Sequence, residues 1–204
     1  MKSGAPTCGS AVRSDAAGEL PLYLAFMEKA LQQRFEDAVV DVPDFPKPGV
    51  VFKDLNGVWR DPVLCRDVVA AIAEEAKALG IEAVAGIESR GFLMGMPLAL
   101  ALGVPFIMVR KAGKLPGTVL REEYALEYGE AAIEVQSGAV QQGQRVLVHD
   151  DVLATGGTAA ACGTLVRAAG GEVVGWSFLI ELSFLGGRDQ LGLGGQIVRP
   201  LLSI

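Results

Sequence analysis

Two adjacent carboxylates stand directly before a loop of small residues in the segment VLVHDDVLATGGT, residues 146–158. Asp150 and Asp151 end an apolar run that is typical of a buried strand, and a helix is predicted after the loop. Uncovered backbone amides at a helix N-terminus attract an anion, while carboxylates can accept hydrogen bonds from sugar hydroxyls or meet a metal ion. The segment therefore indicates a sugar-phosphate site. The residues expected to hold the phosphate are Ala154, Thr155, Gly156, Gly157 and Thr158.

The loop sequence TGGT alone could be an ordinary turn between a strand and a helix. It lacks the lysine of a nucleotide P-loop and the glycine spacing of a dinucleotide fingerprint. The acidic pair strengthens the interpretation, because adjacent carboxylates are costly unless cations or hydroxyls meet them. The single histidine, His149, is expected to pack or hydrogen-bond at the strand end. If it touched Asp150, activity should show an extra ionisation near neutral pH.

A second segment with chemical potential is ESRGF, residues 88–92, which also follows a predicted strand. The hydroxyl of Ser89, the guanidinium of Arg90 and exposed amides suit a doubly charged phosphate group. The alternative is a surface arginine that forms a salt bridge with Glu88. The next predicted strand leads into VRKAGKLPGT, residues 109–118, which supplies three cations. Its Gly and Pro content favours a mobile loop that closes over a substrate, although a solvated basic loop would look the same. The three cations are Arg110, Lys111 and Lys114.

Strands and helices alternate along most of the chain, which predicts an α/β fold with a parallel sheet. Ligands of such sheets bind at the carboxyl ends of the strands, where all three segments lie. The Pro-rich stretch at 42–54 is predicted to be a loop. The predicted strands are 82–87, 104–109, 131–136, 145–150 and 172–182, and the predicted helices are 20–34, 61–79, 91–102 and 158–169.

Length and charge restrict the class of protein. A chain of 204 residues fits one domain, here predicted at 19–204 after a loose arm at 1–18. The net charge of −6 argues against general binding to nucleic acid or to an anionic membrane. Three scattered cysteines and a polar N-terminal stretch favour a cytoplasmic protein. Residues 91–109 carry no charge, but Gly and Pro interrupt them, so a buried helix and strand are expected instead of a membrane span.

Residues 146–158 resemble the phosphoribosyl-pyrophosphate (PRPP) motif of type I phosphoribosyltransferases at nearly all of their 13 positions, with His149 replacing a usually apolar residue. ESRGF resembles the family's pyrophosphate loop, and 109–118 resembles its catalytic lid. The resemblance implies a twisted, mainly parallel sheet flanked by helices, with a small hood around 40–55 and a flexible lid loop at about 110–130. It also implies a cis peptide between Glu88 and Ser89.

Three further segments resemble the adenine phosphoribosyltransferases within that family. They are FPKPGVVFKD at 45–54, YALEYG at 124–129 and IELSFLGGRDQL at 180–191, so the likeness spans roughly residues 40–190. The resemblance implies that Phe52 and Leu182 cover the two faces of adenine while the backbone of Val51 to Lys53 reads its edge. A backbone carbonyl there would reject the 6-oxo purines. The alternative is that these aromatic and Pro-rich pieces only pack.

The implied reaction joins adenine to PRPP, giving AMP and pyrophosphate. The resemblance assigns catalysis to Asp150, Asp151, Arg90 and a general acid/base, Glu127, with Tyr128 beside it on the lid. It also implies Mg²⁺, held mainly by PRPP with the two aspartates nearby. A homodimer is implied as well, with Arg110 reaching the neighbouring site. Two alternatives stay open: a transferase for another purine such as hypoxanthine or xanthine, and a non-catalytic PRPP-sensing regulator of the same fold.

Overall fold

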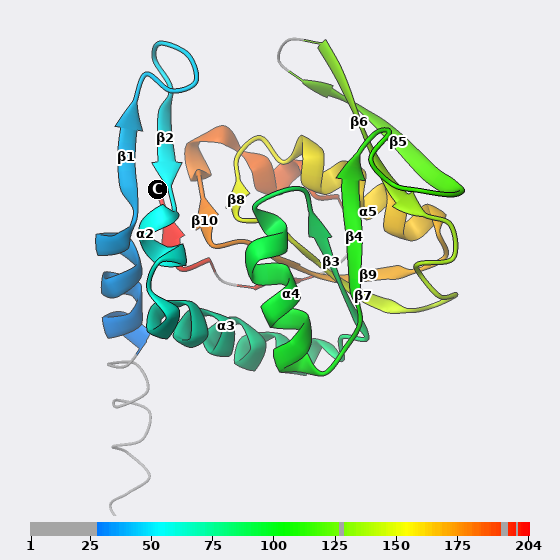
Figure 1. The fold of residues 1–204 in the computed structure, drawn as a ribbon, viewed down its shortest axis with the longest axis horizontal. Coiled ribbons are helices and arrows are strands. Elements are labelled where there is room, and N and C mark those ends of the chain that lie inside the picture. Colours follow the sequence, from blue (N-terminus) through cyan, green and yellow to red (C-terminus); the bar gives the residue numbers. More distant parts are fainter. Residues whose placement is uncertain (1–27, 127–128, 193–195, 199) are drawn as a thin grey trace, which may run out of the picture.

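A central, mainly parallel sheet forms the framework of the protein (Figure 1). The computed structural model describes residues 28–126, 129–192, 196–198 and 200–204. In these ranges the strand order of the sheet is β11-β9-β7-β3-β4-β6-β5. Strand β6 pairs antiparallel with both β4 and β5, and all other neighbouring strands are parallel. Its strands are β3 (Ala83–Ile87), β4 (Phe106–Lys111), β5 (Val119–Leu126), β6 (Gly129–Gln136), β7 (Arg145–His149), β9 (Glu172–Ser177) and β11 (Gln196–Val198).

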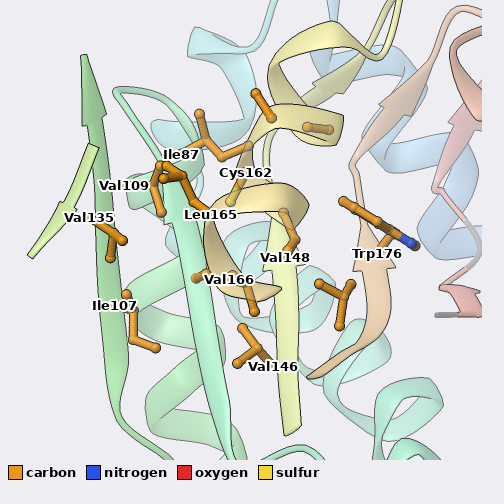
Figure 2. Packing of buried hydrophobic residues seen from close by; sticks show 14 of the residues in the cluster. Ile87, Ile107, Val109, Val135, Val146, Val148, Cys162, Leu165, Val166 and Trp176 are labelled. Atoms are coloured by element: carbon orange, nitrogen blue, oxygen red, sulfur yellow. The ribbon is translucent and has the colours of Figure 1, made fainter. Parts of the chain in front are cut away.

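Helices cover both faces of this sheet and bury one hydrophobic cluster on each. On one face, α5 (Gly157–Ala168) packs Cys162, Leu165 and Val166 against the strands, as Figure 2 shows. The valines of β7 lie opposite the helix in the same cluster. The other cluster joins the sheet to α3 (Pro62–Ala76), to α4 (Gly91–Leu102) and to the helical residues 28–38. The predicted α/β class is therefore confirmed.

Local signals explain where these helices begin and end. The carboxylate of Asp61 accepts from the amides of Val63 and Leu64 at the start of α3, and Pro62 occupies its first turn. The helix continues as the 3₁₀ turn η1 (Lys77–Leu79) and stops at Gly80, whose φ of +57° is left-handed. The predicted bounds 61–79 and 91–102 are therefore confirmed, while the part of helix 20–34 before residue 28 lies outside the described residues, as does the predicted arm at 1–18.

Two small sheets complete the fold. The hairpin β1 (Val40–Pro43) and β2 (Val51–Asp54), followed by α2 (Asn56–Trp59), forms the hood. A parallel sheet of order β12-β10-β8 joins β8 (Val152–Leu153), β10 (Ile180–Glu181) and β12 (Leu202–Ser203). The turns η2 (Ser183–Leu185) and η3 (Gly187–Gln190) follow β10. In Figure 1 the hood and the β5–β6 hairpin rise on opposite sides of the carboxyl ends of β3 and β4.

Three expectations were wrong in detail. Residues 42–54 form much of a hairpin, because the Asp44 carboxylate accepts from the Gly49 amide at 2.7 Å and closes a turn between two short strands. Residues 172–182 are two strands in different sheets, because the carbonyl of Asp151 accepts from the amides of Leu179 and Ile180 and turns the chain there. About half of the stretch expected to be a lid loop, residues 110–130, lies in the antiparallel β5–β6 ladder.

No helix in the described ranges has both the length and the apolar character needed to cross a bilayer. The uncharged stretch at 91–109 is α4 followed by β4, as expected. Cys65 and Cys162 are free thiols, and Cys8 lies outside the described residues.

A buried polar pair interrupts the apolar core at the end of β7. His149 has no exposed surface, and its Nδ1 lies 3.1 Å from the hydroxyl of Ser177 on β9. Its Nε2 is buried without a hydrogen-bond partner among the described residues. Burial lowers the pKa of His149 to about 4, although a backbone hydrogen bond to Ser177 opposes this shift. The folded protein therefore keeps this imidazole neutral at physiological pH.

We predict that His149 makes the fold sensitive to acid. A histidine in the unfolded chain has a pKa of about 6.5. As the pH falls from 6.5 to 4, the unfolded chain takes up the proton first, so the free energy of unfolding should decrease by about 3 kcal/mol through this group. Urea denaturation at pH 7 and pH 4 should show that loss in the wild type but not in His149→Val. Ser177→Ala, which keeps the imidazole, should behave like the wild type. A constant difference between wild type and His149→Val at both pH values would contradict the prediction.

Candidate active site

The loops that follow β3 and β7 meet at the carboxyl edge of the sheet. The two strands are neighbours, with Gly86 paired to His149. Arg90 Nε lies 2.8 Å from Asp151 Oδ2, an ion pair that joins the loops directly. A side chain at Gly91 would begin 2.9 Å from Asp150 Oδ1, so this approach requires glycine. The predicted convergence of residues 88–91 with 150–158 is therefore confirmed, and Arg90 pairs with the acidic pair and not with Glu88.

The acidic pair is electrostatically unusual. Burial, and then the neighbouring Asp151 carboxylate, raise the pKa of Asp150 well above its ordinary value. Burial also raises the pKa of Asp151, while Arg90 opposes that shift. The ion pair lacks hydrogen-bond geometry, so Asp151 Oδ2 is a buried oxygen without a hydrogen-bond donor in the described part of the chain. Hydroxyl groups or a cation bound at this edge would stabilise the ionised carboxylates of Asp150 and Asp151.

The phosphate loop is built around a left-handed glycine. Gly156 has a φ of +83° and precedes the first turn of α5, which begins at Gly157 as the anion-site interpretation requires. A Cβ on Gly156 would lie 2.3 Å from the carbonyl oxygen of Gly187, so η3 packs directly on this loop. The hydroxyl of Thr158 lies 3.2 Å from the hydroxyl of Tyr124 on β5. That contact links the predicted phosphate loop, residues 154–158, to the β5–β6 hairpin, called the lid hairpin from here on.

The three lid cations lie closer to the sheet than a free loop would place them. Arg110 and Lys111 are the last two residues of β4, and Lys114 follows in the turn. Arg110 Nε lies 3.0 Å from Glu88 Oε2, and the ammonium of Lys114 bonds to the other oxygen of the same carboxylate. Burial alone would raise the pKa of Glu88, but bonds from Lys114, Arg110 and the Lys111 amide lower it. The sequence did not single out Glu88 as the residue that gathers these cations.

The hood places an aromatic ring beside Arg90. Its guanidinium carbon lies 4.9 Å from the centre of the Phe52 ring, which also meets Phe45 edge to face at 5.2 Å. Lys53 pairs with Asp41 across the hairpin at 2.6 Å. Among the other residues predicted for the base, Val51 is exposed and Leu182 is half-buried. One arginine thus contacts both the predicted base pocket and the acidic pair.

Comparison with known proteins agrees with this geometry. A family model described as the phosphoribosyl transferase domain matches residues 63–182. An adenine phosphoribosyltransferase from Synechococcus sp. (strain RCC307) is 50% identical over 176 residues, which cover 86% of this chain and 99% of the relative. The chain belongs to the adenine phosphoribosyltransferases. The members of this family join adenine to PRPP and release AMP and pyrophosphate, the reaction that the sequence predicted.

Solved structures of the family share the fold. The enzyme from Rhodothermus marinus has a TM-score of 0.81 and 46% identity, covering 86% of this chain and 99% of that one. The enzyme from Saccharomyces cerevisiae, solved with adenine and an imino-altritol bisphosphate, has a TM-score of 0.80 and 39% identity, with coverages of 85% and 99%. The predicted type I phosphoribosyltransferase fold is confirmed by these matches. The cis peptide between Glu88 and Ser89, expected from the family, is present as well.

Two residues predicted for catalysis, Glu127 and Tyr128, lie outside the described residues, so their roles stay predictions. His149 contacts Ser177 rather than a carboxylate in the described structure, so no extra ionisation near neutral pH is expected from it. Tyr124 and Glu88 were not predicted individually. The signal for Tyr124 was present in the YALEYG segment, but only the fold shows that its hydroxyl reaches Thr158.

We predict that Gly156→Ala destabilises the protein by about 3 kcal/mol or more, because a left-handed backbone and a steric clash act together. Gly143→Ala is the matched control, since Gly143 has a φ of +73° but open space around its Cβ position. The free energy of unfolding of the control should decrease by only about 1–2 kcal/mol, the cost of an alanine in the left-handed backbone conformation. Urea denaturation measures both values, and equal losses would contradict the close packing of the phosphate loop on η3.

Proposed function

We propose that this chain transfers the phosphoribosyl group of PRPP to adenine by means of the three loops at the carboxyl edge of its sheet. The observation that carries the proposal is the Arg90–Asp151 ion pair, which brings a cation suited to diphosphate against carboxylates suited to ribose. The phosphate loop lies beyond the acidic pair in the same chain segment. One extended ligand, with a phosphate at each end of a sugar, fits this order of groups.

The acidic pair would bind the ribose and favour its reaction. Asp150 and Asp151 accept hydrogen bonds from the ribose hydroxyls, while amides of residues 154–158 and the hydroxyls of Thr155 and Thr158 hold the 5′-phosphate. A purine nitrogen attacks the anomeric carbon as the bond to pyrophosphate breaks, and the proposed general acid/base, Glu127, would take up the proton that the base loses. Because the leaving group departs early, positive charge develops on the sugar, and two nearby carboxylates stabilise it.

The opposite charge develops on the leaving pyrophosphate. Ser89 and Arg90 donate to it from the loop after β3, and Arg110, Lys111 and Lys114 supply further cations from the neighbouring strand end. Tyr124 ties the β5–β6 hairpin to the phosphate loop, so a phosphate bound at that loop would lie close to the hairpin. The lid would exclude water, which would otherwise hydrolyse the sugar.

The hood would select the base. In the described structure β2 pairs only with β1, so one edge of Val51–Asp54 has no strand partner and can present backbone groups to a purine. A carbonyl on that edge accepts from the 6-amino group of adenine and opposes the 6-oxo group of hypoxanthine or guanine. Phe52 and Leu182 would lie on the two faces of the ring. Lys53 serves through its backbone, because its side chain is paired with Asp41.

Magnesium fits the acidic edge of this site. No cluster of three or more metal-binding side chains occurs among the residues described. Asp151 Oδ2 is buried and accepts no hydrogen bond there, although Arg90 lies against it as an ion pair, and Mg²⁺ prefers oxygen ligands. Asp150 and Asp151 would approach an ion carried mainly by PRPP. When bound, Mg²⁺ offsets the charge of the pyrophosphate.

A second copy of the chain is the proposed partner. Leu93, Met96 and Leu100 lie at helical spacing on α4, and all three are exposed, as is Met108 on the adjoining β4. An apolar face of this kind suits the homodimer that the family resemblance implied. The described Arg110 bonds to Glu88 and to the Lys114 carbonyl of its own chain, so its reach into a neighbouring site stays a prediction. We place the enzyme in the cytoplasm, where free thiols such as Cys65 and Cys162 stay reduced.

The function is tested by incubating the protein with PRPP, Mg²⁺ and one purine at a time. We predict AMP from adenine and at least about 100-fold lower kcat/KM with hypoxanthine, guanine and xanthine, because a carbonyl acceptor meets an acceptor in those bases. Chromatography of the nucleotide product measures each rate. Comparable turnover of a 6-oxo purine would overturn the adenine assignment, and the absence of any nucleotide product would support the regulator alternative.

A second prediction concerns the general acid/base. Glu127→Leu should lower kcat by about 100-fold or more, the usual effect of losing such a group. Glu123→Leu is the control, because Glu123 lies four positions before Glu127 in the sequence, is an exposed carboxylate on β5, and pairs only with Arg121 among the described residues. Steady-state kinetics with adenine and PRPP measure kcat for both variants, and only Glu127→Leu should show the loss. Near-wild-type kcat in Glu127→Leu would remove that residue from the mechanism.

A further inference from the structure

A single buried carboxylate organises the basic residues of the lid. Glu88 follows β3 directly, and its amide donates to the Val109 carbonyl at 2.9 Å, which fixes it to β4. One carboxylate oxygen accepts from Arg110 Nε at 3.0 Å and from the Lys111 amide at 3.1 Å. The other oxygen accepts from the Lys114 ammonium. Arg110 Nη1 donates in turn to the Lys114 carbonyl at 3.2 Å, so the cluster is closed on itself.

Burial is unequal across this cluster. The side chain of Glu88 is 7% exposed, whereas those of Arg110 and Lys114 are 33% and 47% exposed. The carboxylate therefore lies behind the cations, and the cations present their outer sides to solvent. An anion that approaches from solvent meets the cations first and has no need to displace the carboxylate.

We propose that Glu88 is a positioning residue that holds Arg110 and Lys114 beside the pyrophosphate loop, where they meet the diphosphate of PRPP. This inference rests on the proposed function, because it assigns a role within the same site. Glu88 acts through the two cations and does not touch the substrate.

The charges explain why such an anchor is needed. Arg110, Lys111 and Lys114 lie within five residues of one another, and like charges at that spacing repel. Long basic side chains also lose conformational entropy when they are fixed. A buried carboxylate that holds these side chains in place before the substrate binds reduces both the repulsion among the cations and the entropy that is lost on binding. Because Glu88 adjoins Ser89 and Arg90 in sequence, the gathered cations lie next to the loop that donates to pyrophosphate.

The test compares Glu88→Gln with the wild type. The amide keeps the shape and can still accept from the Lys111 amide, but it loses both ion pairs. We expect the KM for PRPP to rise about 10-fold or more, with less than about 3-fold change in the KM for adenine. Glu88→Asp, which keeps the charge on a shorter chain, should recover part of the loss. A merely structural role would not separate the two substrates in this way.

Glu134→Gln is the matched control. Glu134 is also buried, pairs with Arg110 in the β4–β6 register and accepts from the Gly113 amide at 2.9 Å, but it forms no ion pair among the described residues. The Glu134→Gln substitution removes the same charge from the same region as Glu88→Gln. We expect it to change the KM for PRPP and the KM for adenine by less than about 3-fold. When Lys114→Met is already present, adding Glu88→Gln should raise the KM for PRPP by a clearly smaller factor than Glu88→Gln does in the wild type, because the two residues act as one unit.

Calorimetry with inorganic pyrophosphate and Mg²⁺ tests the inference without turnover, and Glu88→Gln should bind this probe about 10-fold more weakly than the wild type. Equal or tighter binding by Glu88→Gln, or no binding by either protein, would overturn the positioning role. If the wild type made no AMP from adenine and PRPP, the proposed function would fail, and the pyrophosphate titration would still decide the role of Glu88.

Discussion

The site depends on one constraint: two adjacent carboxylates at the end of β7 need a cation. Burial raises the pKa of both aspartates, and Arg90 opposes this effect at Asp151 more than any other group does. Removing one partner of such a pair generally costs about 3–5 kcal/mol, because a buried charge is left uncompensated. The arginine comes from the neighbouring parallel strand, so the order of β3 and β7 in the sheet determines that the two loops meet.

The other parts of the site follow from the position of Arg90. Its guanidinium lies against Phe52 and so joins the hood to the acidic pair. The segment that carries Arg90 also carries Glu88, which binds Arg110 and Lys114 from the next strand. The segment that carries Asp151 continues into the phosphate loop, which Tyr124 links to the lid hairpin. The groups proposed to bind the base, the ribose, the 5′-phosphate and the pyrophosphate are thus connected through short contacts at one edge of the sheet.

Much of this could be predicted from local signals in the sequence. The Asp61-Pro62 cap, the stop at Gly80 and the acidic pair before TGGT each act within a few residues, and the structure has them as expected. The contacts of Glu88, Tyr124 and Ser177 could not be predicted, because strand order indicates which loops meet but not which side chains on different strands and loops face one another. The break at Phe178 was missed because an unbroken apolar run does not show where a chain leaves one sheet for another.

The arrangement of ligand groups is the central claim, and a crystal structure with PRPP and Mg²⁺ tests it most directly. The account predicts the 5′-phosphate on the amides of residues 154–158, the ribose hydroxyls on Asp150 and Asp151, and the diphosphate within reach of Arg90. A complex in which the 5′-phosphate lies away from the start of α5, or in which the diphosphate makes no contact with Arg90, would contradict it.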